Sequence, residues 1–271
     1  MQDMPSGPKK AYFNEAFLRG KDARPLRILA EYLEPESRFE RYKVRDTIVF
    51  MGSARTLPQD VAEAALSKAR AEGGDVEKAE RDLHMSRYYE ASRALAAKVT
   101  EWSKDLKDPD RRFVVCTGGG PGIMEAANRG ASEAKGINLG FNISLPMEQN
   151  ENPYTTRELC LEFHYFFMRK FWFAYLAKAM VIFPGGFGTF DELFEVLTLL
   201  QTQKIQKRMP VVLFGTEYWN EVVNLPALAK WGTIDARDLD LMFTTDSVDD
   251  AFDYLASQLT EYALDQPGAG L

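Results

Sequence analysis

Three times along this chain of 271 residues, a short apolar run ends in a glycine-bearing turn that leads into a helical pattern. The runs cover residues 47–51, 112–116 and 179–182. Strands that alternate with helices predict a mostly parallel sheet with helices on both faces. Right-handed crossovers place every strand-to-helix turn at one edge of such a sheet, where open α/β folds bind their ligands. We therefore predict a doubly wound α/β fold with a ligand site at these turns.

The rest of the chain supplies further strands and helices around this pattern. We expect a helical N-terminal extension over 1–44 that begins with a disordered lead, a catalytic domain over 45–262, and a loose tail over 263–271. Further strands are predicted at 137–143, 162–166 and 209–214, and helices at 58–70, 86–106, 168–178, 193–200 and 247–260. A charged, exposed link is expected over 71–82.

Composition excludes several classes of protein. The net charge of -7 argues against a general nucleic-acid surface, which needs a basic face. Cys116 and Cys160 are too few for a disulfide framework and favour a reducing compartment. No apolar run approaches the roughly 18 residues of a membrane helix, and residues 1–10 lack the apolar stretch of a signal peptide. We expect a cytoplasmic protein with no membrane partner. His84 and His164 lack a second ligand at helical spacing, so no metal site is predicted.

The glycine turns fit no common cofactor motif. Residues 118–123 and 186–191 each depart from the G-x-G-x-x-G dinucleotide pattern, and the G-x-x-x-x-G-K-[ST] phosphate loop is absent. A nicotinamide cofactor and nucleoside triphosphate hydrolysis are therefore disfavoured. Each turn could be a tight turn and nothing more. Three of them at one edge favour an anion site, because glycine amides and a helix N-terminus attract negative charge.

Charged residues near the third turn carry the chemical signal. Glu192 lies just inside the helix that follows this turn, where a carboxylate is unexpected beside an anion. The alternative is a capping box, in which Thr189 caps the helix and Glu192 reaches back to its amide. Arg169 and Lys170 lie within an aromatic run, which favours specific partners over a solvated charge pair. Cys116 ends an apolar strand and is interpreted as a buried residue, not as a nucleophile.

These residues together resemble a known family. The pattern Pro184-Gly185-Gly186-x-Gly188-Thr189-x-x-Glu192, preceded by Arg169-Lys170, is similar to the LOG (Lonely Guy) family. Members are cytokinin riboside 5′-monophosphate phosphoribohydrolases, often mislabelled lysine decarboxylases. Residues 117–130 and 52–55 also resemble the family, and the similarity covers about residues 45 to 262. The N-terminal 40 residues and the insertion near 71–85 are similar to its longer members.

The resemblance implies a Rossmann-like fold, a homodimer or larger homo-oligomer, and a site near the subunit interface. The implied reaction cleaves the N-glycosidic bond of a nucleoside 5′-monophosphate to a free base and ribose 5-phosphate, without a cofactor. Arg169 and Glu192 would be catalytic. Glu192 would stabilise the oxocarbenium-like sugar and position or deprotonate water, and Arg169 would hold Glu192 ionised. The other implied contacts with the substrate are Gly52, Ser53, Arg55, Gly118, Gly119, Gly120, Lys170, Gly185, Gly186, Gly188 and Thr189.

Two alternatives stay open. A pyridoxal-phosphate decarboxylase would need a Schiff-base lysine, and Lys170 is the only lysine near the proposed site. A non-catalytic nucleotide sensor or carrier would use the same crevice and bind a small nucleoside monophosphate without releasing ribose 5-phosphate.

Overall fold

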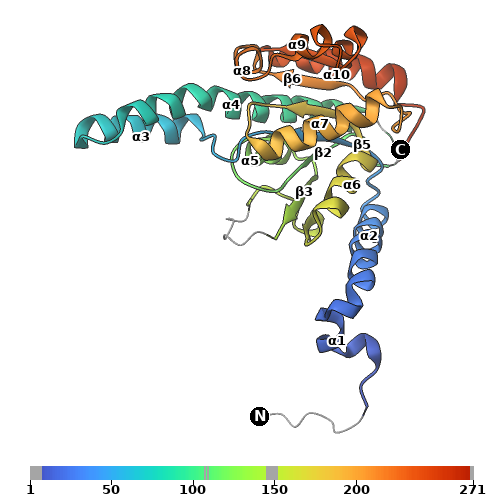
Figure 1. The fold of residues 1–271 in the computed structure, drawn as a ribbon. Helices are drawn as coiled ribbons and strands as arrows, with labels where there is room; N and C mark the ends of the chain where they lie inside the picture. The colour runs from blue at the N-terminus through green and yellow to red at the C-terminus, as the bar shows by residue number, and fades with distance from the viewer. Residues whose placement is uncertain (1–7, 107, 109, 145–151, 269–271) are drawn as a thin grey trace.

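A single seven-stranded parallel sheet forms the centre of the molecule. The computed structural model describes residues 8–106, 108, 110–144 and 152–268 (Figure 1). The strand order is β4-β3-β2-β1-β5-β6-β7, and all six neighbouring pairs within the described residues run parallel. The prediction of an α/β, Rossmann-like fold with a mostly parallel sheet is confirmed. The strands are β1 (Thr47–Met51), β2 (Val114–Thr117), β3 (Asn138–Ile143), β4 (Cys160–Phe163), β5 (Ala177–Ile182), β6 (Val211–Phe214) and β7 (Met242–Thr245).

Helices cover both faces of this sheet. In β1, the side chains of Ile48 and Phe50 enter one apolar cluster and those of Val49 and Met51 enter the other. This alternation is expected for a strand buried on both sides. The first cluster is covered by α4 (Val76–Asp105), α5 (Ile123–Glu133) and α10 (Val248–Tyr262). The second is covered by α2 (Arg24–Arg41), α6 (Phe166–Leu176), α7 (Phe187–Gln201) and α8 (Thr216–Val222). Elsewhere lie α1 (Glu15–Arg19), α3 (Gln59–Glu72) and α9 (Leu225–Lys230), with short 3-10 segments at Ala11–Phe13, Lys21–Ala23, Arg157–Leu159 and Ala236–Leu241.

The strand order reverses next to β1. The chain proceeds outward from β1 through β2, β3 and β4, then returns to place β5 on the other side of β1. Helices on either side of this point lead away to opposite faces, which leaves a crevice at the carboxyl ends of β1 and β5. Two of the glycine turns singled out in the sequence follow these two strands.

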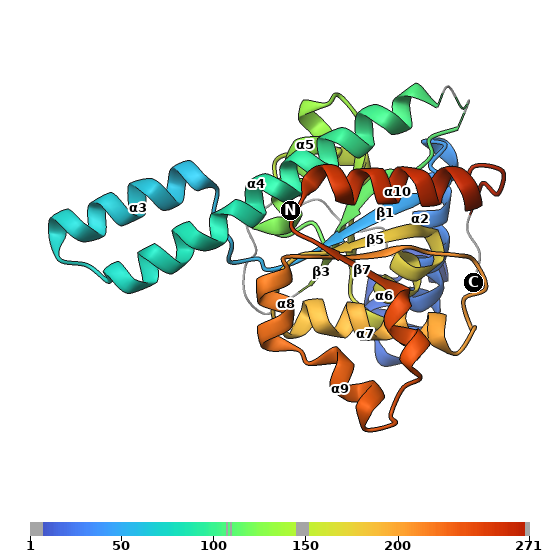
Figure 2. The same ribbon diagram turned by 90° about the horizontal axis from the view of Figure 1, so that it is seen from above.

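The predicted link at 71–82 is wrong. Two helices, α3 and α4, meet there in an antiparallel hairpin that projects from the body (Figure 2). The connection is only residues 73–75, because Gly73 ends α3 in the left-handed conformation (φ 72°) and the Asp75 side chain caps α4. High charge suggested an exposed connection, but the alanine, glutamate, lysine and arginine residues here are also strong helix formers.

The boundary between α6 and β5 also differs from the prediction. We expected helix through residue 178 and strand from 179, whereas α6 ends at Leu176 and β5 begins at Ala177. Lys178 is therefore a strand residue, and it is buried at 5% exposure. Its ammonium lies 3.8 Å from the Asp46 carboxylate at the amino end of β1. A helical interpretation was natural because a charged residue is rare in a buried strand.

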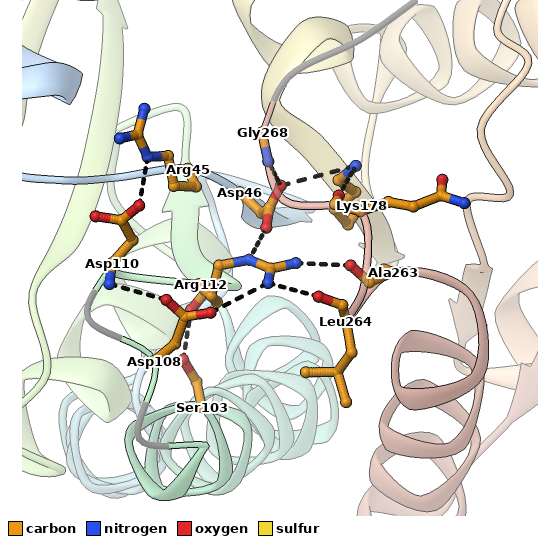
Figure 3. A network of polar contacts seen from close by, with 11 residues as sticks. Arg45, Asp46, Ser103, Asp108, Asp110, Arg112, Lys178, Ala263, Leu264 and Gly268 are labelled. Atoms are coloured by element: carbon orange, nitrogen blue, oxygen red, sulfur yellow. Dashed lines mark hydrogen bonds and ion pairs between the residues drawn. The ribbon is translucent and has the colours of Figure 1, made fainter.

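A buried ionic cluster closes the amino ends of the strands (Figure 3). Asp46 contacts both Arg112 and Lys178, and all three residues are buried. The Arg112 guanidinium also donates to the carbonyls of Ala263 (2.7 Å) and Leu264 (2.9 Å). The Gly268 amide donates to Asp46, and Lys178 donates to the Gln266 carbonyl.

The expectation of a loose tail therefore fails for residues 263–268, because buried charges take their backbone groups as partners. Residues 269–271 of the expected tail, and most of the expected disordered lead, lie outside the described residues.

The remaining helices of the predicted extension are found, with α2 packed on α6 through Tyr32 and Trp172. Across the described part of the chain, no helix combines the length and apolarity that a bilayer crossing requires.

Candidate active site

A cavity of about 680 Å³ opens at the carboxyl ends of β1 and β5. It brings together nine of the residues predicted from the sequence, which come from the turn after β1, from α6, and from the turn and first residues of α7: Gly52, Ser53, Arg55, Arg169, Gly185, Gly186, Gly188, Thr189 and Glu192. The two turns are tied together, since the Ser53 amide donates to the Pro184 carbonyl at 2.9 Å. The switch point of the sheet thus coincides with the cavity.

The third turn is a helix N-terminus that faces this cavity. Helix α7 begins at Phe187 with Gly186 as its N-cap, and no side chain caps it. The first amides of a helix have no intrahelical partner and carry partial positive charge. Gly185 packs against Thr189 so closely that a Cβ would lie 2.1 Å from the Thr189 hydroxyl oxygen. Tyr218 fixes the turn from the other side by donating to the Gly185 carbonyl at 2.6 Å. The arrangement suits a bound anion.

Glu192 is the chemically unusual residue of the cavity. Its side chain lines the cavity although the residue is only 6% exposed. Among the described residues, neither a hydrogen bond nor an ion pair reaches its carboxylate. The capping-box alternative is wrong, because α7 begins two residues before Thr189 and both residues lie inside the helix. Burial raises the pKa of Glu192 to about 7.

Arg169 lies beside this carboxylate and is held by two contacts. Its Nε donates to the Phe141 carbonyl at 2.7 Å, and its guanidinium lies over the Phe173 ring at 5.2 Å. A Cβ on Gly118 would lie 2.5 Å from its Nη2, so any larger residue at 118 would have to displace this guanidinium. We expected Arg169 to keep Glu192 ionised. Lys170 and Arg169 do lower the pKa of Glu192, but burial outweighs both cations.

Lys170 points to a different place from its neighbour. Its ammonium contacts Asp191 at 2.9 Å and Glu195 at 2.5 Å. It lines a separate groove along α7 and not the cavity that holds Glu192. Residues 169 and 170 lie about 100° apart on a helix, so their side chains reach different partners. The structure gives Lys170 two carboxylate partners on α7.

The second glycine turn lies behind the cavity. Gly118 reaches the site through its contact with Arg169, whereas Gly119 and Gly120 are buried and do not line the cavity. The Gly119 amide donates to the Thr117 hydroxyl, which in turn donates to Asn128. Gly119 therefore belongs to a buried polar network, and neither Gly119 nor Gly120 forms part of the described cavity wall.

Several lining residues were missed by the sequence analysis. They form an apolar and aromatic wall, made by Met51, Met85, Met124, Phe166, Phe187, Phe190 and Tyr218. Such residues carry no motif, because apolar side chains are equally common in a core. Met85 was missed for a specific reason: it belongs to α4, which begins ten residues earlier than predicted.

Two other sequence-based interpretations concern metals and thiols. Among the residues that the structure describes, no group of three or more His, Cys, Asp or Glu side chains is placed to hold a metal ion. Cys116 is fully buried, and burial raises the pKa of its thiol. A thiol held in its neutral form is a poor nucleophile.

The raised pKa of Glu192 predicts a pH-dependent stability. The folded protein holds this proton more tightly than the unfolded chain, whose carboxyl has a pKa of 4.5. The stabilisation is complete below about pH 4.5 and is lost as pH rises through about 7. Wild type loses this stabilisation as the pH rises from 5 to 8.5, and Glu192→Gln does not. The unfolding free energy of the variant, relative to that of wild type, should therefore be about 2–3 kcal/mol higher at pH 8.5 than at pH 5. Urea unfolding of both proteins at both pH values measures this change. The prediction would be contradicted if the unfolding free energies of variant and wild type differed by the same amount at pH 5 and at pH 8.5.

About half of this chain is similar to a known family. Residues 124–255 match a family described as "Possible lysine decarboxylase". This range includes Arg169 and Glu192 but not the turn after β1. A comparison with curated proteins found no match.

The chain is also similar to solved structures. One is the X-ray structure of TM1055, at 19% identity and a TM-score of 0.46, over 78% of this chain and 99% of that one. Another is the Moco carrier protein from Chlamydomonas reinhardtii, at 20% identity and a TM-score of 0.46, over 80% of this chain and 99% of that one. A third is the molybdenum cofactor binding protein from the phototrophic bacterium Rippkaea orientalis, at 16% identity and a TM-score of 0.46, over 79% of this chain and 97% of that one.

Proposed function

We propose that this chain, whose residues 124–255 match the family described as "Possible lysine decarboxylase" and resemble the LOG family, hydrolyses nucleoside 5′-monophosphates. The reaction cleaves the N-glycosidic bond and releases a free base and ribose 5-phosphate. One observation carries the proposal: a buried carboxylate without a protein partner among the described residues faces the same cavity as an uncapped helix N-terminus.

The helix N-terminus accounts for the phosphate. The amides of Gly186, Gly188 and Thr189 would bind the 5′-phosphate, assisted by the Thr189 hydroxyl. Hydrogen bonds to a charged group contribute about 1.5–3 kcal/mol each. These contacts lie far from the bond that breaks, so they orient the ribose within the cavity. Ser53 and Arg55 would approach the sugar-phosphate from the turn after β1.

Glu192 and Arg169 account for the chemistry. Cleavage of the sugar-base bond develops positive charge on the ribose, as in glycoside hydrolysis. The Glu192 carboxylate would stabilise that charge and accept the proton of the attacking water, whose oxygen bonds to the anomeric carbon. The departing base takes up a proton from solvent, and Glu192 later releases the proton of the water, so that one water is consumed in all. With a pKa of about 7, Glu192 can hold or release a proton near neutral pH. Arg169 would steer the base or the ribose hydroxyls.

The family description also raises pyridoxal-phosphate chemistry, and the cavity residues do not fit it. A Schiff base needs a lysine in the pocket, and no lysine is found among the described residues that line this cavity. Lys170, the candidate from the sequence, is paired with Asp191 and Glu195 outside it.

A panel of substrates tests the proposal. We expect purified protein to release free base and ribose 5-phosphate from 5′-monophosphates, including AMP and a prenylated adenosine monophosphate. The matching nucleosides lack the phosphate, and losing even two such contacts should lower kcat/KM by at least about 10²-fold. Chromatography of the liberated bases and a ribose 5-phosphate assay provide the readouts.

The same panel separates hydrolysis from carriage. Tight binding of a monophosphate without release of ribose 5-phosphate would contradict the proposed hydrolysis and indicate a carrier or sensor. Equal cleavage of nucleosides and their monophosphates would contradict the phosphate site at the start of α7.

A further inference from the structure

The N-terminal part of the chain forms an arm that leaves the body of the molecule. We define the arm as residues 11–34, which comprise α1, the two 3-10 segments beside it and the first part of α2. Figure 1 shows α1 and the start of α2 extending away from the sheet. Within the arm, only Ala23 is buried. The arm therefore has no core of its own.

Helix α2 carries two apolar stripes, and only one of them packs against other residues that the structure describes. The inner stripe is formed by Ile28, Tyr32 and Phe39, which pack against the apolar core beside α6, and by Pro35, which is buried. The outer stripe is formed by Leu26, Leu29 and Leu33, each 50% exposed. At 100° per residue, the two stripes are centred about 120° apart around the helix. An amphipathic surface helix needs only one apolar stripe, so the second calls for a partner.

The segments that precede α2 also expose large apolar side chains. Tyr12 and Phe13 are 63% and 70% exposed, and Phe17 is 39% exposed. With about 200 Å² for each large side chain, the six residues expose about 600 Å² of apolar surface per copy. Two copies would bury about 1,200 Å², which reaches the lower limit for a specific protein-protein interface. The area therefore matches pairing of one arm with another.

We propose that the outer stripe is a self-association surface, on which the arm of a second copy of this chain packs around a two-fold axis. The leucines at 26, 29 and 33 have the three-then-four spacing of a helix-pairing seam. In a two-fold interface both subunits use the same surface patch. The exposed outer stripe of one copy would therefore pack against the outer stripe of the second copy. The inner stripe remains on α6 and holds α2 in place.

The mass of the full chain in solution tests this pairing. The test variant is Leu29→Glu combined with Leu33→Glu, because buried carboxylates in the seam would be unpaired. The matched control is Val61→Glu on α3, a residue that is 47% exposed but lies outside the arm. At tens of micromolar, we expect light scattering to give the test variant half the mass of wild type, and the control the mass of wild type. Leu26→Lys combined with Leu33→Lys should give the same halving.

Hydrogen exchange locates the contact. We expect the amides of residues 24–34 to lose protection in the test variant, with the rest of the chain unchanged and the far-UV circular dichroism preserved. A wild-type mass of 30.7 kDa, or a test variant that keeps the wild-type mass, would overturn the proposal. A loss of protection on the body as well would overturn the pairing of arm with arm, since the arm would then lie on the partner's body.

Discussion

Replacing Glu192 by glutamine is expected to lower turnover of a nucleoside 5′-monophosphate by about 10²–10⁴-fold while the protein stays folded. Glutamine keeps the shape of the side chain but can neither accept a proton nor offset the charge on the ribose. Glu192 has no protein partner among the described residues, so little native structure depends on its charge. Single-turnover rates with saturating AMP measure the effect, and circular dichroism checks the fold.

Glu195→Gln is the matched control for this substitution. Glu195 lies on the same helix, contacts Lys170 at 2.5 Å and does not line the cavity. We expect its turnover to remain within about tenfold of wild type, because its charge acts only from a distance. The catalytic role of Glu192 would be refuted if its glutamine variant kept the full turnover of wild type.

Replacing Asp46 by asparagine is expected to cost about 3–5 kcal/mol of unfolding free energy. The change leaves Arg112 and Lys178 as buried cations without their carboxylate; their side chains are 1% and 6% exposed. Asp46 also accepts from the Gly268 amide, so the end of the chain should loosen together with the cluster. Guanidinium unfolding measures the free energy, and limited proteolysis measures release of the tail.

The neighbouring pair of Arg45 and Asp110 supplies the control (Figure 3). Their side chains are 44% and 28% exposed, so Asp110→Asn should cost no more than about 1 kcal/mol. If both variants lost the same unfolding free energy, burial would not be the reason that the Asp46 cluster stabilises the fold. Folded Asp46→Asn protein should keep its turnover, because the cluster lies at the amino ends of the strands and the cavity lies at their carboxyl ends.

The sequence could predict those site residues whose type is unusual at their position in a strand, turn or helix. Glycine beside a strand end, and a carboxylate beside a helix N-terminus, stand out in a sequence because ordinary packing does not require them. Met85 and Tyr218 could not be found in this way, since they differ in no respect from core residues until the chain is folded. The role of Lys170 was undecided for a similar reason: its partners Asp191 and Glu195 lie on another helix.

The sequence by itself determined the alternation of apolar runs, glycine turns and helical patterns, and with it a parallel sheet whose turns meet at one edge. This is local information, because periodicity and backbone freedom act within a few residues. Only the tertiary structure decided that the Glu192 carboxylate is buried without a hydrogen bond or ion pair among the described residues, and that burial outweighs the nearby cations. It also decided that residues 263–268 close a buried ionic cluster. Desolvation depends on every atom that surrounds a group, and those atoms come from segments far apart in the chain.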